Sequence, residues 1–247
     1  MKHQIPSWLT ETANKVARFG WAKRLLKPPY YAYKRRVQRK RNEDFRRHAL
    51  GLMRLFHQTM ELAGIEYTLA FGTLLGAVRE KGFIAHDLDI DVAVWHSQQD
   101  ARVRTVLETA GFAFSHSFEV DGGELGREET YIYNGVAIDI FYFYPSLTEG
   151  GLPYCCDFLG KPGAPTYRAC MKKYGGALPR RVELPMERNR ELVPFADLRL
   201  FIPTNADEIL SSRYGDDYMT PNPGWGITSH DAHIVRWEEK LGIYKEA

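Results

Sequence analysis

Three aspartates occupy alternate positions within residues 86–91. Side chains of an extended strand alternate between its faces, so Asp87, Asp89 and Asp91 share one face and the apolar residues between them share the other. Like charges about 7 Å apart repel, and apolar flanks raise that cost by limiting solvation. A divalent cation removes the conflict, and oxygen ligands suit Mg²⁺ or Mn²⁺. The alternative is an acidic strand end in water.

A candidate phosphate-binding segment precedes these carboxylates. Gly72 and Thr73 lie between a strand predicted at residues 67–71 and a short helix predicted at residues 74–79. Backbone N–H groups at a helix N-terminus bind anions, Gly72 permits close approach of a phosphate, and Thr73 adds a hydroxyl. Arg79, near the end of this helix, adds a fixed positive charge. The alternative is an ordinary helix cap.

A further carboxylate, Asp139, interrupts the otherwise apolar strand predicted at residues 136–143. Burying it without a partner is costly, so we expect either a structural partner such as an arginine or a functional role. Phosphoryl-transfer sites often hold two cations about 3.5–4 Å apart through shared carboxylates. Asp89, Asp91 and Asp139 would form such a site if the strands at residues 90–95 and 136–143 are neighbours.

Other residues of metal-binding types favour ordinary roles. Cys155, Cys156 and Cys170 lack the C-x₂-C spacing of zinc sites, which favours free thiols. Three cysteines cannot form a closed disulfide framework, which predicts a reducing, cytoplasmic setting. His230 and His233 are expected to be polar loop residues.

The elements that would position the site form an α+β pattern. Apolar residues recur at helical spacing over residues 43–63, and helices are also predicted at 100–110, 206–214 and 234–241. Strands are predicted at 112–120 and 128–143, where Asn134-Gly135 signals a two-residue hairpin turn. Residues 145–195, rich in Pro, Gly and basic residues, are expected to be an irregular insertion within a domain of residues 48–247.

A basic arm, residues 1–47, precedes that domain. The 247-residue chain has a net charge of +2, but residues 1–48 carry +11 and the remainder −9. Pro28-Pro29 is expected to break the arm, and Tyr31 and Tyr33 interleave with its basic residues. The arm is either a solvated basic helix or a surface for an anionic membrane, and nucleic-acid contact ranks below lipid. No apolar run is long enough to span a bilayer.

Several stretches in fixed order resemble the LicD and fukutin-related family of the polymerase-β-type nucleotidyltransferase superfamily. These stretches cover residues 71–79, 82–92, 138–142 and 202–218. The resemblance implies a small mixed sheet flanked by helices. It also implies that Asp89, Asp91 and Asp139 are metal ligands, that Asp139 is a ligand or the general base, and that Gly72 and Thr73 hold donor phosphate with Arg79 and Asp87 nearby. The chain departs from the family at Ala85-His86, where tryptophan is common.

The resemblance further implies a transferase with a CDP-activated donor. Such enzymes move phosphocholine or an alditol phosphate onto a hydroxyl of a cell-surface glycan or lipid-linked polymer and release CMP. We expect the reaction in the cytoplasm, at the inner face of the membrane. The main alternative is a nucleotidyltransferase acting on a small molecule or protein, because the same carboxylates serve both reactions. A sugar-nucleotide glycosyltransferase and a non-catalytic binding module rank lower.

Overall fold

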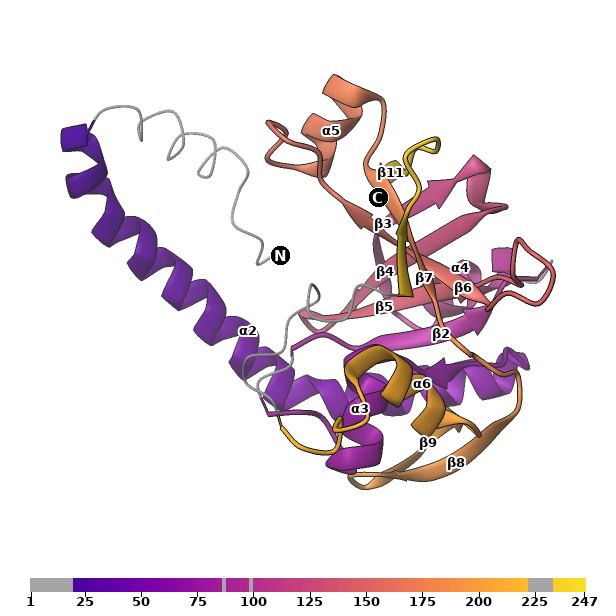
Figure 1. The fold of residues 1–247 in the computed structure, drawn as a ribbon. Helices are drawn as coiled ribbons and strands as arrows, with labels where there is room; N and C mark the ends of the chain where they lie inside the picture. Colours follow the sequence, from indigo (N-terminus) through magenta and orange to yellow (C-terminus); the bar gives the residue numbers. More distant parts are fainter. Residues whose placement is uncertain (1–19, 86–87, 98–99, 222–232) are drawn as a thin grey trace.

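One long helix opens the described chain. The computed structural model describes residues 20–85, 88–97, 100–221 and 233–247, and α2 spans Gly20–Ala63. The first half of α2 projects from the body, and the second half packs beneath the sheet (Figure 1). The apolar stripe predicted for residues 43–63 is confirmed by a set of buried side chains: Phe45, Ala49, Leu52, Met53, Phe56 and Met60.

The predicted break at Pro28-Pro29 is wrong, because α2 continues through both residues. Each proline removes one intrahelical hydrogen bond. Where a helix projects from the body, water can bind the carbonyls that are released, and the turns on either side keep the helix continuous. The predicted boundary between residues 47 and 48 also lies inside α2, so no change of secondary structure marks it.

A six-stranded mixed sheet forms the centre of an α+β fold. Its strand order is β1-β2-β5-β4-β3-β11, with β2 parallel to β5 and every other neighbouring pair antiparallel. The strands span Thr68–Leu69 (β1), Asp91–Trp95 (β2), Ala113–Val120 (β3), Gly126–Tyr133 (β4), Val136–Phe143 (β5) and Ile243–Glu246 (β11). The predicted neighbourhood of the strands at residues 90–95 and 136–143 is confirmed.

The hairpin between β4 and β5 sets the register of the central strands. Asn134 and Gly135 both have positive φ, 49° and 83°, as a two-residue type I′ turn requires. The turn pairs Tyr133 with Val136, and the same register pairs Thr130 with Asp139. The predicted hairpin is therefore confirmed, and it determines which side chains face Asp139.

Short helices flank the sheet. They are α3 (Phe71–Arg79), α4 (Asp100–Thr109), the 3₁₀ turn η1 (Asp121–Gly123), α5 (Tyr167–Tyr174) and α6 (Ala206–Tyr214). The helix predicted at 206–214 is confirmed, and α4 ends one residue before the predicted boundary. Within the described ranges no helix is long and apolar enough to cross a membrane.

Two expectations for the second half of the chain are wrong. Residues 145–195 contain β6 (Tyr154–Leu159), α5, β7 (Leu178–Glu183) and β8 (Arg190–Phe195), which pairs with β9 (Leu198–Pro203). Residues 234–241 contain the strand β10 (Ile234–Arg236) instead of a helix. Both errors come from pairing between distant segments. The strand β10 pairs with β7. Arg180 on β7 forms a bidentate ion pair with Asp157 on β6, which allows a segment with basic residues to form a strand.

Candidate active site

Two of the predicted carboxylates face each other on neighbouring strands. Asp91 and Asp139 are direct register partners on the parallel strands β2 and β5, and the backbone N–H of Asp139 donates to the Ile90 carbonyl at 2.8 Å. Ile90 and Val92 are fully buried, whereas Asp91 is partly exposed. The alternation predicted for this strand therefore holds, and register partners present their side chains on one face of the sheet.

Asp89 lies just before β2 and is the most open of the three, with 60% of its side chain exposed. The guanidinium of Arg41 on α2 donates to its Oδ1 at 3.4 Å. This contact brings the basic half of α2 to the edge of the site, which the sequence did not predict. Asp87, the first predicted carboxylate, lies outside the described residues.

The first turn of α3 is attached to the start of β2. The backbone N–H of Asp91 donates to Thr73 Oγ1 at 2.9 Å, and the Ala70 N–H donates to the Asp91 carbonyl at 3.0 Å. Ala70 provides no side-chain cap. The N–H groups of Phe71, Gly72 and Thr73, in the first turn of α3, therefore have no carbonyl acceptor within the helix. Thr73 is buried, and its hydroxyl already fixes the carboxylate strand.

Phe71 has a φ of 43° at the start of this helix. A bulky residue in the left-handed region costs about 1–3 kcal/mol and persists only where its surroundings hold it. Its ring packs edge-on against Phe141 of β5 at 4.8 Å, and the buried Arg213 guanidinium lies 5.7 Å from the ring centre. The bend starts α3 at Phe71 and brings Gly72 and Thr73 beside Asp91.

Arg79 has a different environment from the one predicted. It donates to Glu80 at 2.9 Å and to the Tyr218 carbonyl at 3.3 Å, and its side chain is largely buried. From the helical rise, Arg79 lies about 10 Å along α3 from Gly72. These contacts join α3 to residues 214–218, so a role for Arg79 in phosphate binding stays a prediction.

Asp139 accepts a hydrogen bond from Thr130 Oγ1 at 2.5 Å, and His116 Nε2 lies 3.3 Å from the same hydroxyl. Burial raises the pKa of Asp139 to about 6; the Thr130 hydrogen bond opposes this rise, the Asp89 charge adds to it and Arg41 opposes it. A carboxyl with such a pKa is mostly ionised at neutral pH and can still take up a proton.

Glu128 is a carboxylate near the site that the sequence analysis missed. It lies two residues before Thr130 on β4, so both side chains project to the face that carries Asp139. Among the described residues its carboxylate makes no hydrogen bond or ion pair. Burial raises its pKa well above the usual range, and the charges of Asp139, Asp157 and Asp91 raise it further.

Several carboxylates thus gather on one face, but within the described residues no three His, Cys, Asp or Glu side chains are arranged to hold a metal ion. The donor set still fits a hard cation chemically, because it consists of oxygen ligands whose charges are mutually unfavourable. The three cysteines are free and buried, in agreement with the prediction, and His233 contacts Ser212.

Comparison with known proteins finds similarity in the part of the chain that contains this site. Residues 64–151 match the family described as LicD/FKTN/FKRP, nucleotidyltransferase domain. The matched stretch makes up about a third of the chain, and the similarity to this family applies to that stretch. The stretch contains every residue that the sequence analysis assigned to the site, together with Glu128 and Thr130.

Several proteins that are similar to parts of this chain carry the names of transferases. The ribitol-5-phosphate transferase FKTN of Mus musculus is 24% identical over 210 residues, covering 81% of this chain and 41% of that protein. The ribitol 5-phosphate transferase FKRP of Homo sapiens is 29% identical over 93 residues, 35% of this chain and 18% of FKRP. The lipopolysaccharide cholinephosphotransferase LicD of Haemophilus influenzae is 51% identical over 43 residues, 17% of this chain and 16% of LicD. The chain thus spans about two fifths of the length of FKTN.

Proposed function

We propose that this chain transfers phosphocholine or an alditol phosphate from a CDP-activated donor to a glycan hydroxyl and releases CMP. The observation that carries the proposal is the pairing of Asp91 with Asp139 beside the first turn of α3. Names of the LicD-family relatives support the choice of transferred group. We also propose the polymerase-β-type fold, in which a mixed sheet holds such carboxylates.

Asp89, Asp91 and Asp139 are the residues that would hold Mg²⁺ or Mn²⁺. The ion would neutralise charge on the phosphate oxygens of the donor. The backbone N–H groups of Gly72 and Thr73 would bind a donor phosphate oxygen, and the Thr73 hydroxyl can donate its proton while it accepts from Asp91.

Asp139 would accept the proton of the attacking hydroxyl. The Thr130 hydrogen bond orients its carboxylate, as a base that works near neutral pH requires. The new bond joins the acceptor oxygen to the phosphorus that carries the alcohol, and the bond from that phosphorus to the CMP oxygen breaks. CMP leaves with the negative charge of that oxygen.

The test is CMP release from CDP-choline, CDP-ribitol or CDP-glycerol with candidate glycans and Mg²⁺ or Mn²⁺, each compared with EDTA. Asp89→Ala should abolish release. The matched control is Asp197→Ala, because Asp197 also pairs with an arginine, Arg54, and is similarly exposed, 62% against 60%. Pyrophosphate formed from an NTP, without CMP from any CDP-alcohol, would instead favour the nucleotidyltransferase alternative.

We further propose that the basic half of α2 meets an anionic membrane on the cytoplasmic side. Tyr31 and Tyr33 are exposed among Arg35, Arg36 and Arg39, and clusters of basic residues with interfacial aromatics favour anionic headgroups. Replacing the three arginines with glutamine should reduce sedimentation with phosphatidylserine vesicles and leave turnover of a soluble acceptor unchanged. Unchanged sedimentation would make this segment an ordinary solvated helix.

A further inference from the structure

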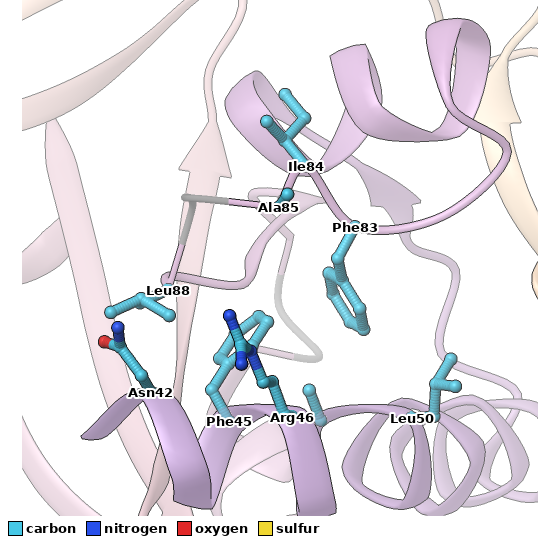
Figure 2. A pocket seen from close by; sticks show the side chains of 9 residues that line it. Asn42, Phe45, Arg46, Leu50, Phe83, Ile84, Ala85 and Leu88 are labelled. Carbon is cyan, nitrogen blue, oxygen red and sulfur yellow. The ribbon is translucent and has the colours of Figure 1, made fainter. Parts of the chain in front are cut away.

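A pocket of about 250 Å³ lies between α2 and the loop that leads to the carboxylates (Figure 2). Its walls are mainly apolar, and both sides contribute. The apolar side chains are Phe45, Ala49 and Leu50 from α2 and Phe83, Ile84 and Leu88 from the loop. Phe45 and Phe83 contact each other edge-to-face at 4.9 Å, which joins the two sides of the pocket.

The pocket is next to the proposed reaction centre. Leu88, in its wall, directly precedes Asp89 in the chain, and Asp89 contacts Arg41 one helical turn before Phe45. Anything bound in this pocket is therefore close to the carboxylates that would handle the acceptor hydroxyl. The donor-phosphate segment, at the start of α3, is a separate element of the site.

Arg46 brings a positive charge to these apolar walls. Figure 2 shows its guanidinium pointing from α2 toward the loop, between Leu88 and Phe83. Arg39 and Lys40 form ion pairs with Glu43 and Asp44 one turn further along α2. Arg46, by contrast, makes no hydrogen bond or ion pair with any residue that the structure describes. Its charge is thus available to an anionic ligand.

The dimensions limit what such a ligand is. A volume of about 250 Å³ lies below the roughly 300–1,000 Å³ of pockets for drug-sized ligands, so it admits a short hydrocarbon segment and not a whole lipid. Apolar walls favour hydrocarbon, and an arginine in the wall favours phosphate.

We infer that this pocket binds the phosphate-proximal carbons of a lipid-phosphate-linked acceptor, with Arg46 on the phosphate and the attached sugar directed toward Asp89. The inference rests on the proposed function and narrows its acceptor to a lipid-linked glycan. The carbons of the lipid that are nearest to the phosphate would bind in the pocket.

Geranyl phosphate is a direct probe, and its binding to the full chain can be measured by calorimetry without turnover. Arg46→Gln and Leu50→Glu should each weaken binding by about tenfold or more, since they remove the charge partner or place a carboxylate at the apolar wall. Matched controls are Arg47→Gln, the exposed neighbour outside the pocket, and Leu62→Glu on the same helix, 91% exposed. Both should change the affinity less than about twofold.

Two ligand controls separate the parts of the inference. Geraniol should bind more weakly than geranyl phosphate, and inorganic phosphate should compete poorly. Equal competition by inorganic phosphate would show an anion site only, and absent binding or equal losses in the control variants would overturn the inference. CMP release with a soluble glycan but no geranyl phosphate binding refutes the pocket alone. Binding with the expected variant pattern, but without CMP release from any donor, refutes the proposed function and leaves the pocket standing.

Discussion

Both faces of the central sheet hold carboxylates that are buried or partly buried, but the two faces differ in the partners that they give to these charges. On the core face, Glu129 is 6% exposed and accepts hydrogen bonds from the hydroxyls of Tyr131 at 2.8 Å and Tyr142 at 2.9 Å. On the site face, Asp139 accepts from Thr130, and Glu128 has no hydrogen bond among the described residues. Adjacent residues of β4, Glu128 and Glu129, therefore have opposite surroundings.

This difference distinguishes structural from functional acidity. Two neutral donors satisfy the Glu129 carboxylate within the fold, and burial followed by its negative charge raises the pKa of Tyr142 well above its usual range. Glu128 and Asp139 instead repel each other, and burial first of all raises both pKa values. An arrangement that stays unfavourable without a partner is typical of a ligand or catalytic site.

The largest expected effect is on turnover, from Asp139→Asn. The variant keeps the size of the side chain and removes the charge that would bind cation or accept the proton. We expect CMP release to fall by about a thousandfold or more. Circular dichroism and thermal unfolding should show a fold at least as stable as the wild type. A fall of less than tenfold would remove Asp139 from the chemistry and weaken the distinction between the faces.

Glu129→Ala should give the opposite result. It leaves the hydroxyls of Tyr131 and Tyr142 buried without their acceptor, at about 1–3 kcal/mol for each unsatisfied group. The free energy of unfolding in urea should fall by about 2–4 kcal/mol, while turnover per folded molecule stays within about threefold of the wild type. If Glu129→Ala lowers turnover as much as Asp139→Asn does, the core face is not independent of the site.

Glu128→Gln tests whether the missed carboxylate belongs to the site. We expect turnover to fall by about tenfold to a hundredfold, because Glu128 shares a face of the sheet with Asp139 and interacts with it electrostatically. Stability should be equal or higher, because a buried like charge is removed. Glu124→Gln is a useful control, because Glu124 is exposed and precedes the first residue of β4. If both substitutions change turnover equally, Glu128 has no role in the site.

The site was largely predictable from local patterns and the hairpin. The alternation of Asp89 and Asp91 with buried residues and the turn at Asn134-Gly135 are confirmed. The same two-residue turn implies that Thr130 faces Asp139, because each step away from the turn adds one pair on either strand. The positions of Glu128 and Thr130 on the face of Asp139 were therefore predictable from the sequence, by extending the register from the turn along both strands.

The rest required contacts that no local pattern contains. Arg41 meets Asp89 across 48 positions, and β10 and β11 form only because β7 and β3 offer edges. The strand β7 includes Arg180 and Arg181, whose charges are compensated by Asp157 and by the ring of Trp237 at 5.1 Å. Such partners change a basic segment from an expected loop into a strand, and they become visible only in three dimensions.

A smaller effect concerns stability as a function of pH. The folded pKa of Asp139, about 6, exceeds the ordinary value of 3.8, so the folded state binds more protons between these limits. In EDTA, ionised Asp139 should cost the wild type about 3 kcal/mol relative to Asp139→Asn at pH 7, and the difference should shrink as the pH falls toward 4. Mg²⁺ at pH 7 should also reduce this difference in stability between the wild type and Asp139→Asn. A pH-independent difference would contradict the raised pKa.

The smallest effect is expected at Thr130, whose hydroxyl donates to Asp139. Thr130→Val keeps the shape and removes the donor, so the pKa of Asp139 should rise further and the acid limb of the pH–rate profile should move to higher pH. At pH 7 turnover should fall by about threefold to tenfold, with little change at pH 8.5. Thr130→Ser restores the donor and should restore the profile. If Val and Ser give the same profile, the hydrogen bond does not tune the base, and the two faces differ only through the crowding of their charges.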